Sequence, residues 1–159
     1  MAIESIEELE QYRETHRQAD CYESVVPGVR LQHRCRVSSV LRCLRKYAES
    51  LPPDRRATLL EVGCGEGYLL AQIRDAFPDW ELVGVDLSTF AVDCARTRVP
   101  SARVEVCQGS DYPLDAGGAD VVVCSEVIEH VHDDGGLLDS IRDILGDSGT
   151  LVLTTPNLY

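Results

Sequence analysis

The feature that most constrains the fold of this chain is a regular alternation of short apolar runs and amphipathic segments from residue 57 onward. The apolar runs are rich in Val and Leu with few polar interruptions, which is typical of strands covered on both faces. They span residues 58–62, 81–85, 103–107, 119–124 and 150–155. Helical patterns lie between them at residues 68–76, 88–98 and 136–145. This alternation predicts an α/β fold with a parallel sheet and right-handed crossovers.

The first third of the chain has a helical pattern without strands. A capping-box pair predicts a helix over residues 5–20. A second helix is expected over residues 29–50, with its basic side chains on faces other than the apolar one, and a pair of prolines follows it. We therefore expect a helical cap or lid at residues 1–52 and a core at residues 53–159.

Charge limits the partners that this chain can have. The 159 residues carry a formal net charge of −12, which argues against sequence-independent nucleic-acid binding because such binding needs Lys and Arg at the phosphates. Residues 28–48 run against this trend, since they hold six bases and no acid. A nucleic-acid partner is therefore not expected, although the basic segment keeps that alternative open.

Apolar content and cysteine spacing bear on location. No apolar run approaches the roughly 20 residues that span a bilayer, and the acidic N-terminus lacks the apolar stretch of a signal peptide. Seven cysteines are present without a C-x-x-C pair, which disfavours a disulfide framework or a zinc site. We expect no membrane association, reduced thiols and a cytoplasmic location.

A glycine-rich loop follows the first expected strand. Gly63, Gly65 and Gly67 would let the backbone turn tightly and lie close to a ligand, although a plain strand–helix turn would use the same residues. A pyrophosphate binds at a helix N-terminus. The negative charges of Glu61 and Glu66 would repel a pyrophosphate from this one. The loop therefore favours a ligand that carries positive charge.

The second expected strand ends in Asp86, which follows Gly65 by 21 residues. A carboxylate at this position accepts hydrogen bonds from ribose hydroxyls in nucleotide-binding sheets. The alternative is a helix-capping role, which Ser88 could fill instead. Polar turns also follow the third strand, at residues 108–112, and the fourth, at residues 124–131. The first of these turns could reach an adenine edge.

Four runs, taken in order, resemble the class I S-adenosylmethionine-dependent methyltransferases: LLEVGCGEGYLL, VGVDLS, VVVCSEVIEHV and LVLTTPN. The resemblance covers residues 57–157, about two thirds of the chain. It implies a Rossmann-like sheet in the order 3-2-1-4-5 with flanking helices, an N-terminal helical lid and the last two of the usual seven strands absent. It also implies S-adenosylmethionine as cofactor and in-line transfer of its methyl group to an oxygen or nitrogen atom of a small-molecule acceptor.

The resemblance also implies a cofactor site. The methionine part of the cofactor would lie against Glu61, Gly63, Cys64 and Gly65, with the ribose on Asp86 and the adenine on Leu87. Further adenine contacts would come from Ser110, Asp111 and Tyr112, where the acid is shifted by one position from the family's Gly-Asp pattern, and the backbone carbonyl of Cys124 would take the cofactor's amino group. The cofactor carboxylate would need a basic donor, for which Arg30, Arg34 and Arg36 are candidates and Arg34 is our choice.

The segment after the fourth strand supplies the candidate catalytic residues, His130 and Glu126. His130 could accept a proton from an acceptor hydroxyl, or it could only orient the loop. A third alternative is a metal site at Glu126, Glu129 and His130, a cluster that resembles small-RNA 3′-terminal ribose 2′-O-methyltransferases. That alternative would make the chain a metal-dependent methyltransferase of RNA 3′ ends. A non-catalytic cofactor-binding domain is the remaining alternative.

The fifth strand would leave Leu151, Val152 and Leu153 on an unpaired sheet edge, which proteins usually avoid. We therefore expect either that the chain is a truncated form or that this edge is covered in a homodimer.

Overall fold

Five parallel strands form the single sheet of the part of the chain that the structure describes. This computed structural model describes residue 11, residues 27–109 and residues 111–156. The strand order is β3-β2-β1-β4-β5, and every neighbouring pair is parallel. This is the predicted Rossmann-like order. The strands are β1 (Thr58–Val62), β2 (Glu81–Asp86), β3 (Arg103–Val106), β4 (Ala119–Ser125) and β5 (Leu145–Thr154).

The fifth strand begins earlier than predicted. It starts at Leu145, directly after the preceding helix, and Leu145 pairs with Ala119. The next pair joins Thr150 to Val121, so the polar residues 146–149 bulge out between two paired stretches. The apolar pattern predicted only the second of these stretches, because the bulge has the Gly, Asp and Ser content of a turn.

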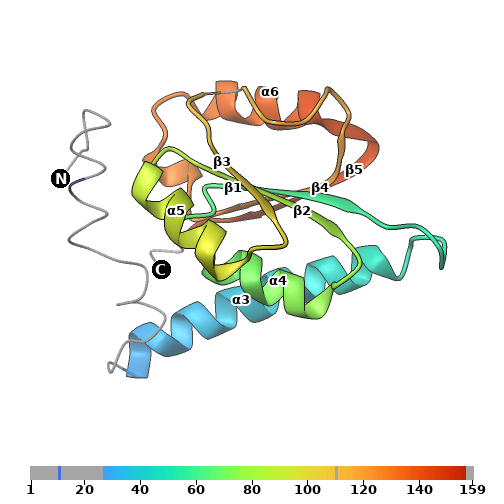
Figure 1. Cartoon of the computed structure of the whole chain (residues 1–159), viewed down its shortest axis with the longest axis horizontal. Helices are drawn as coiled ribbons and strands as arrows, with labels where there is room; N and C mark the ends of the chain where they lie inside the picture. The colour runs from blue at the N-terminus through green and yellow to red at the C-terminus, as the bar shows by residue number, and fades with distance from the viewer. Residues whose placement is uncertain (1–10, 12–26, 110, 157–159) are drawn as a thin grey trace.

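Helices cover both faces of the sheet (Figure 1). The helices are α3 (Pro27–Ala48), α4 (Tyr68–Ala76), α5 (Thr89–Arg98), η1 (Ile128–His130) and α6 (Asp134–Ile144). Figure 1 shows α6 above the sheet and α3 and α4 below it. The helix predicted over residues 5–20 lies outside the described residues, apart from residue 11. None of the helices in the described ranges is long and apolar enough to cross a bilayer.

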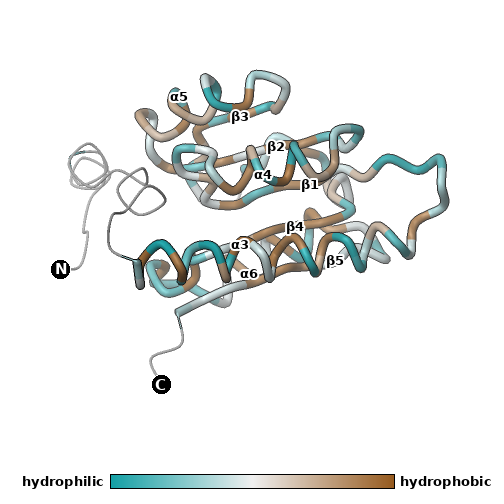
Figure 2. Tube along the Cα trace, turned by 90° about the horizontal axis from the view of Figure 1, so that it is seen from below, coloured by the Kyte–Doolittle hydropathy of each residue, from teal (hydrophilic) through white to brown (hydrophobic). Residues whose placement is uncertain are grey.

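The strands bury side chains on both faces, as their composition predicted. Leu59 and Val121 pack with α3, α4 and α5, whereas Leu60 and Val122 pack with α6. Figure 2 shows apolar colouring along β4 and at intervals along α3. Because strand side chains alternate, Glu61 lies on the same face as Leu59. This places its carboxyl beneath the helix layer that contains α3.

The α3 helix packs into the core rather than lying apart from it. Val37, Val40 and Leu44 are buried in the same cluster as the first face of the sheet. The expected apolar stripe also included Val40 and Leu44, which are buried, and Leu41 and Ala48, which pack against the same cluster. That part of the stripe is confirmed. Its first members, Leu31 and Cys35, are exposed, so the prediction is wrong only near the start of the helix. The division of the chain at residue 52 stays a prediction.

Candidate functional site

The loop between β1 and α4 needs its glycines. Gly63, Gly65 and Gly67 have φ angles of 72°, 53° and 78°, a left-handed region that glycine enters without strain. A Cβ at Gly63 would collide with a side-chain methyl of Val127, which follows β4. The backbone N–H of Gly63 donates to the carbonyl of Val85 over 2.8 Å. The loop is therefore held tightly between β2 and the segment after β4.

Asp86 fixes this loop from the end of β2. Its side chain is buried, and its Oδ2 accepts a hydrogen bond from the backbone N–H of Gly65 over 2.8 Å. Its Oδ1 accepts from the N–H of Ser88 over 3.0 Å. The N-cap of α5 is Ser88, whose hydroxyl accepts from Ala91. Asp86 is thus not the helix cap, and its carboxylate joins the ends of β1 and β2.

Glu61 is a buried acid inside this arrangement. Its side chain is 3% exposed, and Oε2 has no hydrogen-bond partner among the described residues. Burial raises the pKa of Glu61 to about 8, while Arg36 acts to lower it and Asp86 to raise it further. An orphaned carboxyl oxygen beside a glycine loop is complementary to a cationic ligand group.

Glu126 occupies a strained position directly after β4. Its φ angle is 58°, which costs a non-glycine residue about 1 kcal/mol or more. Three contacts hold it there. Its backbone N–H donates to the carbonyl of Thr154 over 2.9 Å, its Oε1 accepts from Thr154 Oγ1 over 3.0 Å, and its Oε2 lies 3.9 Å from Nη1 of Arg36. Residues that neighbouring contacts hold in a strained backbone conformation cluster at functional sites.

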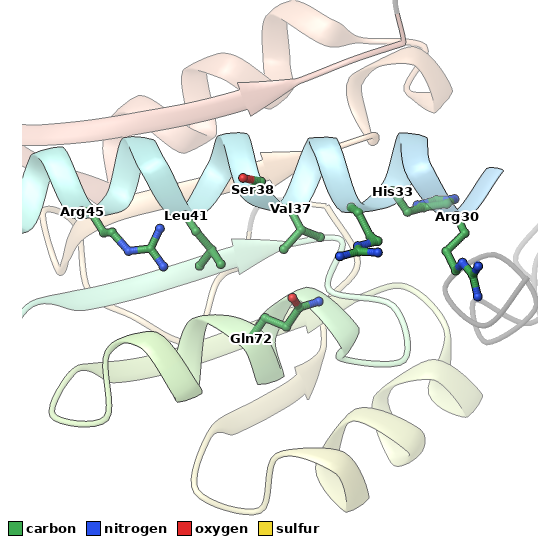
Figure 3. Close-up of a pocket in the computed structure, with 8 residues that line it drawn as sticks. Arg30, His33, Val37, Ser38, Leu41, Arg45 and Gln72 are labelled. Atoms are coloured by element: carbon green, nitrogen blue, oxygen red, sulfur yellow. The ribbon is translucent and has the colours of Figure 1, made fainter. Parts of the chain in front are cut away.

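Arg36 is the basic residue of α3 that faces the site carboxylates. It forms the ion pair with Glu126 and lowers the pKa of Glu61. Arg34, the predicted carboxylate donor, instead lines a groove between α3 and α4 together with Arg30 (Figure 3). Helical spacing alone does not separate the two residues, because at 3.6 residues per turn Arg34 and Arg36 lie at similar angles on either side of the buried stripe. The ion pair with Glu126 is what distinguishes Arg36.

The predicted adenine contacts are only partly assembled. Leu87 is 42% exposed beyond β2, where it offers an apolar surface. Tyr112 instead turns toward α6, and its hydroxyl lies 3.1 Å from the hydroxyl of Ser140. Asp111 is exposed, and residue 110 lies outside the described part of the chain. Adenine contacts from this turn stay a prediction for Asp111 and for Ser110.

Two predicted site residues are small buried cysteines. Cys64 lies in the glycine loop and packs in the cluster beneath α3 and α4. Cys124 is fully buried in the other cluster, and burial raises the pKa of its thiol to about 11. Both therefore act as apolar side chains at neutral pH. The predicted role of Cys124 concerns its backbone carbonyl, which this burial does not alter.

The predicted catalytic pair does not form one cluster with Glu129. His130 and Glu129 both lie in η1 and are exposed, and Glu129 accepts a hydrogen bond from Thr155 over 3.4 Å. Glu126 instead faces Arg36. Across the described ranges, no three His, Cys, Asp or Glu side chains are grouped so that they could hold a metal ion. The alternative metal site at Glu126, Glu129 and His130 is therefore not assembled here.

Sequence reasoning missed two residues beside Glu126. Thr154 holds its carboxylate and its backbone, and the LVLTTPN run was the available signal. His33 lies near both Glu126 and Arg36; burial lowers its pKa, Arg36 lowers it further and Glu126 raises it. His33 lies three residues before Arg36 on α3, and this helical spacing was the signal that could have identified it.

Comparisons with known proteins agree with this geometry. A family model described as "Methyltransferase domain" matches residues 31–159. The chain belongs to this methyltransferase family. A probable S-adenosylmethionine-dependent methyltransferase of Mycobacterium tuberculosis is 36% identical over 116 residues, which is 70% of this chain and 40% of the relative. A ubiquinone biosynthesis O-methyltransferase of Azorhizobium caulinodans is 34% identical over 114 residues, 69% of this chain and 44% of the relative.

Solved methyltransferases share the fold. The CurJ carbon methyltransferase has a TM-score of 0.78 at 20% identity and covers 99% of this chain and 43% of its own. The geranyl diphosphate C-methyltransferase of Streptomyces coelicolor, solved with S-adenosyl-L-homocysteine, has a TM-score of 0.61 at 25% identity over 73% of this chain and 44% of its own. This methyltransferase chain spans about two fifths of the length of the first curated relatives that it matches.

Proposed function

We propose that this chain binds S-adenosylmethionine and transfers its methyl group to a small-molecule acceptor by in-line displacement. The observation that carries the proposal is buried Glu61, whose Oε2 has no partner among the described residues and which lies beside the glycine loop that Asp86 fixes. A ligand ammonium would satisfy that oxygen. S-adenosylmethionine has such an ammonium and a sulfonium against one carboxylate, so its net charge suits an acidic loop.

The residues present fit the rest of the cofactor. Asp86 would accept hydrogen bonds from the ribose hydroxyls, and exposed Leu87 would pack against the adenine. Arg36 would meet the cofactor carboxylate, since it already faces Glu61 and Glu126. In this proposal Arg36 takes the role that was predicted for Arg34.

The chemistry divides between cofactor and protein. The bound sulfonium supplies an activated methyl group, so the protein mainly orients the acceptor, which can lower the barrier by about 7–11 kcal/mol at best. We propose that exposed His130 accepts the proton of an oxygen or nitrogen acceptor. Glu126 would orient Arg36 and the acceptor, because its carboxylate is already held by Thr154. An acceptor carbon is the alternative, as the Streptomyces coelicolor neighbour is a C-methyltransferase.

A transfer assay tests the proposal. The full chain is incubated with methyl-labelled S-adenosylmethionine and panels of hydroxyl, amine and activated-carbon acceptors. We expect labelled product in one panel and at least a tenfold lower rate for His130→Ala, with no change for exposed His132→Ala. Cofactor binding without turnover on any panel would contradict methyl transfer and favour the non-catalytic binding domain.

The exposed edge of the sheet is a candidate dimer contact. Among the described strands β5 pairs only with β4, and Leu153 is 41% exposed. We propose that two copies cover this edge, as unpaired edges favour pairing. Sedimentation at rising concentration should show a dimer that Leu153→Lys abolishes, whereas a monomer throughout the series would contradict the proposal.

A further inference from the structure

A groove of about 210 Å³ lies between α3 and α4, outside the cofactor residues. Figure 3 shows Val37 and Leu41 pointing from α3 toward α4, with Gln72 of α4 facing them and Arg30 at the start of α3. We call the end that carries Arg30, His33 and Arg34 the basic end. Arg45 lies at the other end, and Leu41 is the half-buried apolar side chain between them. Its lining residues are Arg30, His33, Arg34, Val37, Ser38, Leu41, Arg45 and Gln72.

The arginines of this groove are not neutralised by the described part of the protein. Arg30, Arg34 and Arg45 form no ion pair or side-chain hydrogen bond with any described residue. Arg42, which lies outside the groove, also has no carboxylate partner among the described residues, so a missing partner does not by itself mark the groove. What marks it is that three guanidinium groups line one hollow, an arrangement complementary to an anion.

Helix electrostatics point the same way. The first turn of α3 contains no acid, although a carboxylate there would be stabilised by the helix dipole. Instead Arg30 adds positive charge in that first turn, where the dipole disfavours it, and Arg34 follows one turn later. A bound anion would relieve the repulsion between the two arginines and the unfavourable position of Arg30.

The basic end of the groove adjoins the cofactor site. His33 lines the groove and also lies close enough to Glu126 and Arg36 for both to change its pKa. Arg30 stands about 9 Å before Arg36 along the helix axis, at 1.5 Å per residue. In Figure 1 the first residues of α3 lie on the same side as the described end of the chain, where β5 ends. The head group of a ligand held at this end would lie on the side of the cofactor site, with the rest of the ligand extending along α3.

We propose that the α3–α4 groove binds the methyl acceptor, and that this acceptor is a small amphipathic anion. Its carboxylate or phosphate would be held by Arg30, His33 and Arg34, and its apolar part would lie on half-buried Leu41. This inference rests on the proposed methyl transfer for the identity of the ligand as acceptor. Anion binding itself does not depend on that function.

The first test measures anion binding to the cofactor-free full chain by calorimetry. The probes are octyl phosphate and octanoate, with octanol as the neutral control. We expect the anions to bind and octanol not to bind, and the tighter of the two anions identifies the head group. Arg30→Gln and Arg34→Gln should each weaken the anion about tenfold or more, because each removes a charge-assisted hydrogen bond. Arg42→Gln is the matched control on the same helix, since Arg42 lies outside the groove and bonds Ser39.

The second test separates this inference from the proposed function. S-adenosylmethionine affinity should be unchanged in Arg34→Gln, while the KM for an anionic acceptor rises about tenfold at constant kcat. Two results would overturn the groove proposal alone. In the first, the wild type binds the cofactor but no anion. In the second, the wild type and both variants bind octyl phosphate equally well. Tighter binding of a short RNA than of either small anion would also overturn it. If the wild type does not bind S-adenosylmethionine, the proposed function is overturned instead.

Discussion

Nη1 of Arg36 lies 3.9 Å from Oε2 of Glu126, and this ion pair joins α3 to the end of β4. Both side chains are less than one quarter exposed, so water screens the pair less than it would a surface pair. The same arginine acts on buried Glu61. Arg36 thus links the helix that forms the groove to the two carboxylates of the candidate cofactor site.

Replacing Arg36 with Gln should weaken S-adenosylmethionine binding by roughly tenfold, because the cofactor carboxylate loses a charged donor. The melting temperature should also fall, since Glu61 and Glu126 lose their positive neighbour. Calorimetry and thermal unfolding measure the two effects. Arg42→Gln on the same helix is the control, and equal cofactor affinity in both variants would rule out this role for Arg36.

Glu61 should make the stability of the cofactor-free protein depend on pH. Its pKa is about 8 in the folded protein against an ordinary value of 4.5, so between these values the folded state holds a proton that the unfolded state has released. Stability therefore falls as pH rises through this window. Glu61→Gln removes the titration, so its melting temperature should exceed that of wild type increasingly from pH 5 to about pH 8, with the difference levelling off by pH 9.

Glu105→Gln is the control for that series, since half-buried Glu105 pairs with exposed Arg103 at the edge strand β3 and no other ion pair of Glu105 is found among the described residues. A difference between Glu61→Gln and wild type that stays constant from pH 5 to pH 9 would argue against a buried, protonated Glu61.

Cofactor binding should release a proton from Glu61. An ammonium beside Oε2 favours the ionised carboxylate and lowers its pKa. The binding enthalpy at pH 7 should therefore vary with the ionisation enthalpy of the buffer for wild type, and it should not vary for Glu61→Gln. Buffer-independent enthalpies for the wild type would exclude this linkage.

Gly63→Ala should destabilise the fold by roughly 1–3 kcal/mol. The new methyl group would meet Val127, and the φ angle of 72° is strained for alanine. Chemical denaturation measures the free energy of unfolding. Gly28→Ala is the control, because a Cβ at Gly28 meets nothing within 4 Å. Equal stability of the two variants would show that the loop does not need its glycine there.

Much of the fold could be predicted because its strands are buried on both faces. Continuous Val and Leu runs of this length are typical of strands covered on both faces, and the helical pattern over residues 68–76 predicted α4 with the bounds that it has. The start of β5 was not predictable, because residues 146–149 look like a turn and the pairing of Leu145 with Ala119 depends on the neighbouring strand.

The site was less predictable than the fold. Asp86 and Glu61 follow from strand ends, since parallel strands bring their carboxyl ends to one edge. The choice between Arg34 and Arg36 depended on which of the two side chains reaches Glu126, and only the packing of α3 against the sheet decides that. The direction of Tyr112 and the left-handed backbone of Glu126 depend on contacts with Ser140 and Thr154, which lie 28 residues away in each case.

The central claim is that the ends of β1 and β2 hold S-adenosylmethionine, and calorimetric titration of wild type and Asp86→Ala tests it most directly. Asp86 would lose its bonds to the ribose and to the loop N–H of Gly65, so we expect a Kd at least ten- to a hundredfold higher. Asp139→Ala, an exposed acid on α6, should bind like wild type. No binding to the wild type, or equal affinity in all three proteins, would contradict the account.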